Sequence, residues 1–590
     1  MLPRMTPASR PIAGFLLALL LALGIAASER APRAFAFEAP EGASGFTRKP
    51  LVTAKKHMVV ASHPLASEAG LAILRKGGSA TDAGIAIQMV LTLVEPQSSG
   101  IGGGAYILYW DAGAKTLVSI DGRETAPQAA TPELFLDEKG EPLPRETAMA
   151  SGASIGVPGA LAALKRAHDK YGKLPWAELF QPAIALAREG FAISPRLAAQ
   201  IAEEGPDSFA PEARAYFFDE AGRPLPSGYR LKNPALAETL ETIVRDGPDA
   251  FYRGAIARDI ADAVQRDPRR PGRFTTDDLA RYRAIEREPV CVPYRLHRVC
   301  GMGPSSSGGV TVGQVLALIE FYDLGPAPLG AHAAHLIVEA ERLAYADRAL
   351  YLADPDFVSV PAGLLDSNYI AERRALIDPT RAREHVAAGL PPNTKQGSFG
   401  LDRTHERKGT SHIAVVDGHG NAFSMTTSIE QAFGSRTMVR GFLLNNQLTD
   451  FSFAPTDEDG RTIANRVQGG KRPRSSMDPT IVFGPDGLRY VLGSPGGSAI
   501  IFYNVKTIVA LIDWGLDPEE ALALINFGSI EKAVLLEPGA AWDDLAASLA
   551  TMGHEVRRVP LTSGEHVIAI TRQGLEGGAD PRREGVALGD

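Results

Sequence analysis

The sequence predicts an α+β fold in which a run of helices separates two groups of antiparallel strands. Helix and strand signals are mixed along the 590 residues rather than strictly alternating. Turn-forming residues at 111–113 and 417–421 each join two short apolar segments, which is typical of hairpins. Helices between two groups of antiparallel strands suit stacked sheets with helices outside them, although the pattern by itself supports only the α+β class.

The part of the chain before residue 378 is predicted to be mainly helical. Residues 65–76 have helical spacing and stop at Gly77-Gly78, and residues 80–93 are apolar nearly all round, which predicts a buried helix. The first hairpin joins strands at 105–110 and 116–120. Further helices are predicted over 158–171, 176–187, 234–245, 255–265, 309–321 and 331–351.

Strands predominate after residue 410. The Asp-Gly-His-Gly-Asn turn at 417–421 predicts a hairpin between strands at 411–416 and 422–428. Two more strands are predicted near 479–483 and 488–492, and helices follow near 498–513 and 518–525.

The first 36 residues have the features of an export signal. Arg4 and Arg10 precede an apolar run at 12–27, and small-residue cleavage sites follow at 26–27 and 34–36. A membrane anchor is the alternative, but the run is short for a spanning helix. We therefore expect residues 1–36 to be a signal peptide. The mature protein is expected to be secreted or periplasmic and to contain no membrane segment.

Charge and residue composition exclude two classes of partner. The formal charge is −8 and no basic stripe is present, which argues against a nucleic acid. The twelve histidines are scattered and contain no His-x-x-x-His, so neither a metal nor another cofactor is expected.

Cysteine occurs twice, at Cys291 and Cys300. If Arg295 and Leu296 form a turn, the two sulfurs lie opposite each other on adjacent strands. A disulfide is then expected in an oxidising compartment, with two buried thiols as the alternative.

Two short sequence motifs lack the flanking strand and helix that their functions require. Residues 152–156 fit G-x-S-x-G around Ser154, but a poor strand precedes the serine and the next helix waits until residue 158. Residues 100–105 fit a dinucleotide fingerprint, but they follow a helix and precede a strand, the reverse of the required order.

Thr410 has the setting of an N-terminal nucleophile. It stands at the start of a buried strand, behind Gly409 and a charged loop at 378–409. Cleavage after Gly409 would give the threonine a free α-amine, which can serve as general base for the threonine's own hydroxyl. Glycine before the threonine lets the backbone take the conformation that internal attack requires.

In this setting the chain resembles the γ-glutamyltranspeptidase family of N-terminal-nucleophile hydrolases, whose precursors cut themselves before such a threonine. The resemblance implies a four-layer αββα sandwich formed jointly by two chains, a large subunit of residues 37–409 and a small catalytic subunit of residues 410–590. It rests on six collinear blocks: 100–104, 121–127, 410–430, 441–451, 471–477 and 493–498.

The resemblance also implies roles for catalytic residues. Thr410 would attack the Gly409 carbonyl in the precursor and the γ-amide carbon of the substrate in the mature enzyme. Ser428 matches a hydroxyl that hydrogen-bonds the nucleophile. Gly496 and Gly497, in a loop between a strand and a helix, match the oxyanion hole.

The expected substrate is a γ-glutamyl compound such as glutathione. Arg123, Ser475 and Ser476 match the family's contacts to its α-carboxylate, with Arg123 able to form a two-pronged pair. Asp450 and Gln447 match the residues that face its α-ammonium.

This chain departs from the family pattern in two places. Glu430 stands where well-known members carry Asn. The stretch between Phe453 and Ser475 has no aromatic residue, whereas some members close the pocket there with an aromatic lid. Both departures lead us to expect that hydrolysis to glutamate is favoured over transfer to amino acids or peptides.

Two other functions stay open. A cephalosporin or glutaryl acylase can be built on the same scaffold, although Arg123, Asp450 and the paired serines favour an α-amino acid substrate. A secreted binding protein that has lost activity is the second alternative.

Overall fold

The computed structural model describes residues 42–395, 397, 399–404 and 409–590. The predicted signal peptide lies outside the described residues, as do positions 396, 398 and 405–408 of the predicted cleavage loop. One compact unit, residues 39–590, contains every element that the structure describes. Among these elements no helix is both long and apolar enough to cross a membrane.

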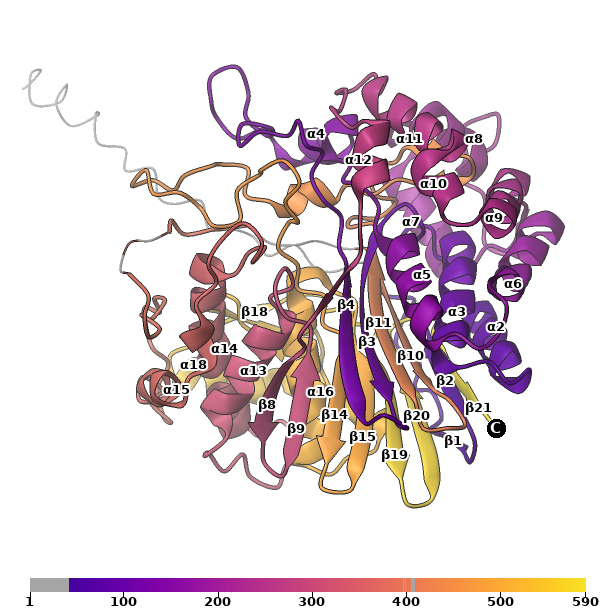
Figure 1. The fold of residues 1–590 in the computed structure, drawn as a ribbon. Helices are drawn as coiled ribbons and strands as arrows, with labels where there is room; N and C mark the ends of the chain where they lie inside the picture. Colours follow the sequence, from indigo (N-terminus) through magenta and orange to yellow (C-terminus); the bar gives the residue numbers. More distant parts are fainter. Residues whose placement is uncertain (1–41, 396, 398, 405–408) are drawn as a thin grey trace, which may run out of the picture. The chain divides into compact units, whose positions relative to one another are not determined.

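Two seven-stranded antiparallel sheets form the centre of this unit (Figure 1). Strand β10, which begins at Thr410, lies in the middle of the first sheet, between β2 and β11. The first sheet has the order β21 (Val586–Gly589), β2 (Met58–Ala61), β10 (Thr410–Val416), β11 (Ala422–Ser428), β3 (Gly104–Asp111), β4 (Thr116–Gly122), β7 (Ile285–Arg287). The second has the order β1 (Val52–Ala54), β20 (Gly574–Ala579), β19 (His566–Thr571), β15 (Gly487–Gly493), β14 (Thr480–Gly484), β9 (His297–Gly301), β8 (Val290–Tyr294).

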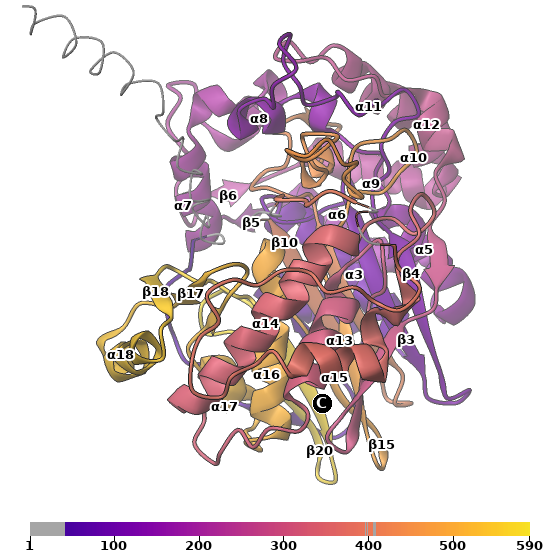
Figure 2. The same cartoon turned by 90° about the vertical axis from the view of Figure 1, so that its left-hand side faces the viewer.

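Helices cover the outer face of each sheet, and Figures 1 and 2 show the resulting four layers. The first sheet is covered by α2 (Pro64–Arg75), α3 (Ala80–Val94) and α5 (Ala160–Tyr171). The second is covered by α13 (Gly308–Ile319), α14 (Ala331–Tyr351) and α16 (Ile500–Ile512). The expected four-layer αββα sandwich is therefore confirmed.

Alternation along the strands builds a separate apolar layer on each side of a sheet. In β10, Ile413 and Val415 belong to the core beneath the helices, whereas Ala414 and Val416 belong to the core between the two sheets. Successive strand residues point to opposite faces, so one strand serves both cores.

Most predicted elements are present, and the differences have local causes. The predicted helix at 331–351 matches α14, and both predicted hairpins are found. The sequence analysis did not predict β2 or the C-terminal strands β19 to β21. Strand β2 is four buried residues without polar alternation, which periodicity cannot tell from part of a buried helix, and β20 contains three glycines, which weaken a strand pattern.

Cys291 and Cys300 are joined by a disulfide in the structure. They are direct partners in the β8–β9 hairpin, whose turn is formed by Arg295 and Leu296. Of the two alternatives left open by the sequence, the structure contains the disulfide.

Two buried histidines lie side by side where the two sheets face each other. His566 donates from Nδ1 to the carbonyl oxygen of His412 at 2.9 Å, and both side chains are buried. Burial lowers the pKa of His566 to about 3, and burial together with His566 lowers the pKa of His412 well below its usual value. Both rings are therefore neutral in the folded protein at pH 7.

We expect this pair to make the fold sensitive to mild acid. A histidine with a lower pKa in the folded state stabilises the fold above its unfolded pKa of about 6.5, and this contribution is lost as the pH falls toward the folded pKa. His566 alone should lower the free energy of unfolding by about 2 kcal/mol between pH 7 and pH 5. Urea unfolding at both pH values measures this loss.

The matched variant is His566→Asn, which keeps a side-chain N–H near the His412 carbonyl but cannot titrate. Its stability should fall less between pH 7 and pH 5 than that of the unmodified protein. An identical pH dependence in the two proteins would contradict the assignment.

Candidate active site

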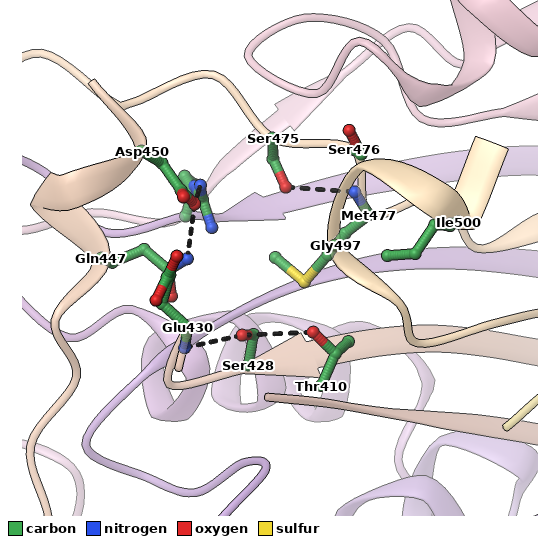
Figure 3. Close-up of a pocket in the computed structure, with 11 residues that line it drawn as sticks. Thr410, Ser428, Glu430, Gln447, Asp450, Ser475, Ser476, Met477, Gly497 and Ile500 are labelled. Atoms are coloured by element: carbon green, nitrogen blue, oxygen red, sulfur yellow. Dashed lines mark hydrogen bonds and ion pairs between the residues drawn. The ribbon is translucent and has the colours of Figure 1, made fainter. Parts of the chain in front are cut away.

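A small polar pocket, here named the Thr410 pocket, lies where β10 begins and β11 ends. Nine of the ten residues predicted for catalysis or substrate binding line it; Gly496 does not. Figure 3 shows how residues far apart in the sequence converge on it. Its lining consists of Arg123, Thr410, Ser428, Glu430, Gln447, Asp450, Ser475, Ser476, Met477, Gly497 and Ile500.

Thr410 and Ser428 are direct strand partners at the edge of this pocket. The Thr410 hydroxyl lies 3.4 Å from Ser428 Oγ, which also accepts from the Glu430 N–H at 2.8 Å (Figure 3). Ser428 donates its own proton to the carbonyl oxygen of Gly409 at 2.5 Å. One hydroxyl thus contacts both the candidate nucleophile and the carbonyl just before it.

Two glycines allow the backbones around Thr410 to approach each other closely. Gly409 has φ +132°, and a Cβ there would lie 2.2 Å from the carbonyl oxygen of Glu430. A Cβ on Gly103 would lie 2.1 Å from the carbonyl oxygen of Ser428. The glycines at 100–104, which fit a dinucleotide fingerprint poorly, therefore include one that packs directly against the strand bearing Ser428.

The backbone of Thr410 is also held from the side opposite the pocket. Arg583 donates to the Thr410 carbonyl oxygen at 3.1 Å, and the Ser411 hydroxyl donates to Glu95 at 2.9 Å. Burial raises the pKa of Glu95 to about 8, and Arg196 contacts the same carboxyl at 2.6 Å. Sequence reasoning missed these groups because no local pattern connects them to Thr410.

A buried ion pair joins Arg123 to Asp450. Arg123 Nη2 donates to Asp450 Oδ2 at 2.6 Å, and other N–H groups of Arg123 reach the carbonyl oxygens of Pro473 and Arg474 at 3.2 and 3.0 Å. These bonds engage Nε and Nη2, so the expected two-pronged pair with a substrate carboxylate is not available in this arrangement. Of the three guanidinium nitrogens of Arg123, Nη1 alone has no hydrogen-bond partner among the described residues.

Two acceptors without partners lie beside this ion pair. Gln447 Nε2 donates to Asp450 Oδ2 at 2.8 Å, as Figure 3 shows. Asp450 Oδ1 and Gln447 Oε1 are buried and accept from no group within the described part of the chain. Buried polar atoms without partners are rare in native proteins, so these two oxygens point to a missing donor.

Ser475 and Ser476 are positioned by a segment that the sequence analysis did not identify. Ser307 donates from its backbone and hydroxyl to the Ser475 carbonyl oxygen at 2.7 and 2.6 Å. Arg348, on α14, donates to the hydroxyls of Ser476 and Ser307 at 2.8 Å each. The Pro-Ser-Ser-Ser-Gly-Gly run at 304–309 was the available signal, since such a run rarely lies in regular structure.

The glycine-rich loop that connects β15 to α16 has the backbone geometry that only glycine adopts readily. Gly496 has φ +140° and Gly497 has φ +56°. A Cβ on Gly496 would lie 2.6 Å from the ring of Tyr503, and Tyr345 donates to the Ser498 carbonyl oxygen at 2.5 Å. Packing and hydrogen bonding therefore both fix the loop, with Gly497 on the pocket wall.

Glu430 has a cationic neighbour. Arg145 Nη2, at the start of α4 (Arg145–Met149), lies 3.6 Å from Glu430 Oε1. The Arg145 guanidinium also lies over the ring of Phe453, 5.5 Å from its centroid. The negative charge of Glu430 is therefore partly balanced by the protein, which the sequence did not indicate.

Ser154, the other hydroxyl considered from sequence, has a structural role. It ends a short 3-10 helix (Gly152–Ser154), is buried, and donates to the carbonyl oxygens of Met149 and Ser151. A metal site is not found either: no cluster of metal-binding side chains occurs among the described residues.

Comparison with known proteins gives one consistent family. The model of the gamma-glutamyltranspeptidase family matches residues 66–590. A glutathione hydrolase proenzyme of Bacillus subtilis (strain 168) is 37% identical, and the match covers 91% of this chain and 92% of that protein. The Acylase ACY 1 proenzyme of Pseudomonas sp. (strain SE83) is 36% identical, and the match covers 92% of this chain and 94% of that protein. The crystal structure of a cephalosporin acylase from Bacillus halodurans has a TM-score of 0.80 at 29% identity, covering 94% of this chain and 99% of that one.

The close approach of Gly103 to β11 can be tested by substitution. In Gly103→Ala the new methyl group meets a backbone oxygen that cannot rotate away, so the free energy of unfolding should fall by about 3 kcal/mol. Gly113→Ala is the matched control, because its methyl group would have 3.4 Å to the nearest atom. Chemical unfolding of both variants should separate them clearly, and equal stabilities would contradict the packing argument.

Proposed function

Because the chain belongs to the γ-glutamyltranspeptidase family, we propose that it is a self-processing enzyme that uses Thr410 to cleave the γ-glutamyl amide bond of glutathione and related compounds. The observation that carries this proposal is the Thr410 pocket, where a hydroxyl nucleophile faces unpartnered acceptors suited to an α-ammonium. No cofactor is required for this chemistry.

The α-ammonium of a γ-glutamyl substrate has three N–H donors, and the pocket offers acceptors for them. Asp450 Oδ1 and Gln447 Oε1 are both buried without partners among the described residues, and Glu430 lies on the same wall. Ammonium binding would therefore satisfy two oxygens that are costly to leave unpaired.

The α-carboxylate is assigned to Arg123, Ser475 and Ser476. Ser475 and Ser476 supply hydroxyls, and Arg123 supplies positive charge and its remaining N–H. Arg123 has a second task, because its ion pair with Asp450 at 2.6 Å holds that carboxylate in the position where it faces the ammonium. The two ends of the amino acid are thus recognised by one connected set of charges.

The first chemical step is attack on the γ-carbonyl carbon. The free α-amine of Thr410, with an ordinary pKa of about 8, takes the hydroxyl proton as Oγ1 forms a bond to that carbon. Backbone N–H groups at Gly496 and Gly497 stabilise the oxyanion, and the leaving amine receives the proton. Water then releases glutamate from the ester, or an amino acid or peptide amine takes the acyl group.

The α-amine exists only after the chain has been cut between Gly409 and Thr410. In the uncut chain Ser428 already donates to the Gly409 carbonyl, which polarises the carbon that Thr410 Oγ1 would attack. As Oγ1 forms its bond to the Gly409 carbon, the amide C–N bond to Thr410 breaks and the threonine nitrogen takes up the hydroxyl proton. Water then hydrolyses the ester, which leaves a large subunit of residues 37–409 and a small subunit of residues 410–590.

The two subunits are expected to remain together as a heterodimer. In the first sheet, β10 and β11 of the small subunit pair with β2 and β3 of the large one. In the second sheet, β14 of the small subunit pairs with β9 of the large one. Neither piece could complete its sheets alone, so separation would expose long unpaired strand edges.

Hydrolysis is proposed to exceed transfer, because residues 454–474 offer no aromatic side chain that could close the pocket against water. The second reason suggested by the sequence, an uncompensated charge on Glu430, is weakened by Arg145 at 3.6 Å.

The principal alternative is an acylase that acts on a dicarboxylic acyl group without an α-ammonium. The acylase relative and the cephalosporin acylase structure support it. The unpartnered oxygens of Asp450 and Gln447 favour the γ-glutamyl substrate, since a glutaryl group has no donor for them.

Location outside the cytosol is proposed on two grounds. The N-terminal segment has the pattern of an export signal, and a disulfide joins Cys291 to Cys300. Disulfides persist mainly in oxidising compartments.

Self-cleavage predicts two fragments on a denaturing gel, and N-terminal sequencing of the smaller one should begin Thr-Ser-His-Ile. Thr410→Ala should remain one chain. Ser428→Ala should be cut about 100-fold more slowly, because it loses the donor to the Gly409 carbonyl. An uncut protein with full activity would refute the role of Thr410.

A γ-glutamyl anilide tests the reaction itself. The purified protein should release glutamate from it, and glycylglycine should stimulate product formation only weakly. Glutamate and γ-glutamyl peptide are measured together from the same donor, with Thr410→Ala as the inactive control. A several-fold stimulation by glycylglycine would contradict the preference for hydrolysis, while absence of any glutamate release would contradict the proposed function.

A further inference from the structure

The contact between Arg145 and Glu430 places a protein cation beside a residue that lines the Thr410 pocket. Arg145 Nη2 lies 3.6 Å from Glu430 Oε1. This separation exceeds the 2.7–2.9 Å typical of a charge-assisted hydrogen bond. The two groups therefore attract each other as charges without a short hydrogen bond that would fix their orientation.

Aromatic packing holds Arg145 in this position. Its guanidinium lies over the ring of Phe453, and that ring stacks on Phe135 with centroids 4.5 Å apart. Arg145 Nε and Nη2 are buried and donate no hydrogen bond to any described residue. The arginine is thus positioned by its flat face, with N–H groups left over near the carboxylate of Glu430.

Glu430 consequently faces two cations when a γ-glutamyl substrate binds: the guanidinium of Arg145 and the α-ammonium. We propose that Arg145 is a specificity-determining residue, which competes with the substrate ammonium for the carboxylate of Glu430. The inference rests on the proposed function, because it requires the ammonium to bind at Asp450, Gln447 and Glu430.

This competition has opposite consequences for two kinds of acyl group. An acyl group with an α-ammonium must share Glu430 with Arg145. It therefore binds more weakly than it would if Asp450, Gln447 and Glu430 were all available to the ammonium. An acyl group without the ammonium leaves the contact between Glu430 and Arg145 undisturbed, so its binding loses nothing to the competition. Arg145 therefore lowers the preference of the pocket for γ-glutamyl over glutaryl groups.

L-Glutamate and glutarate are suitable probes, because they differ only in the ammonium group. Their competitive inhibition constants against a γ-glutamyl anilide should be measured for the unmodified enzyme and Arg145→Met. In the variant, L-glutamate should bind at least about threefold more tightly, and glutarate should bind no better or more weakly. The ratio of the two constants is the decisive quantity.

Two controls separate this effect from structural damage. Lys139→Met removes one positive charge from the exposed loop before α4 and should leave the ratio unchanged. In a Glu430→Gln background, Arg145→Met should no longer alter the ratio, since the carboxylate for which the cations compete is gone. Arg145→Gln serves as the second variant if Arg145→Met does not fold.

The inference is overturned if Arg145→Met leaves the ratio of the two inhibition constants unchanged. It is also overturned if Arg145→Met changes this ratio equally in the Glu430→Gln background. The proposed function fails separately, when the unmodified enzyme releases no glutamate from the anilide or when L-glutamate does not inhibit it competitively.

Discussion

The position of Thr410 depends on how closely three stretches of backbone can approach one another. The carbonyl oxygen of Ser428 occupies the space where a Cβ of Gly103 would stand. In the same way, the carbonyl oxygen of Glu430 occupies the space where a Cβ of Gly409 would stand. These contacts set Thr410 opposite Ser428 at the end of a strand pair inside the first sheet. A larger residue at either glycine would displace the backbone segments that place these two hydroxyl groups.

Charge in the pocket is arranged before any substrate is bound. Burial by itself lowers the pKa of Arg123, but the neighbouring Asp450, Tyr106 and Glu124 raise it further than burial lowers it. Burial also raises the pKa of Glu124, whose carboxyl lies 3.8 Å from Arg123 Nη1, to about 8. Breaking such a buried pair from one side would leave an uncompensated charge, which is why each partner fixes the other.

The sequence predicted what local patterns encode and missed what distant contacts create. Helix α14 and the β10–β11 hairpin follow from periodicity and turn residues, and nine of the eleven residues of the Thr410 pocket were predicted from the six collinear blocks. Strands without alternation, such as β2 and β20, gave no signal. Arg145 and Arg348 were missed for another reason: a single arginine carries no periodicity, and the partner of each in the Thr410 pocket lies more than a hundred positions away.

The hydroxyl of Ser428 is placed to act in both halves of the proposed mechanism. In the uncut chain it donates to the Gly409 carbonyl and lies 3.4 Å from the Thr410 hydroxyl. Cleavage removes that carbonyl, and with it the acceptor for the serine's proton. The N–H of Glu430 still holds Ser428 in place, so its proton can turn to the threonine oxygen or the new amine. One side chain can therefore stabilise the internal attack first and orient the nucleophile afterwards, without any rearrangement of the strands.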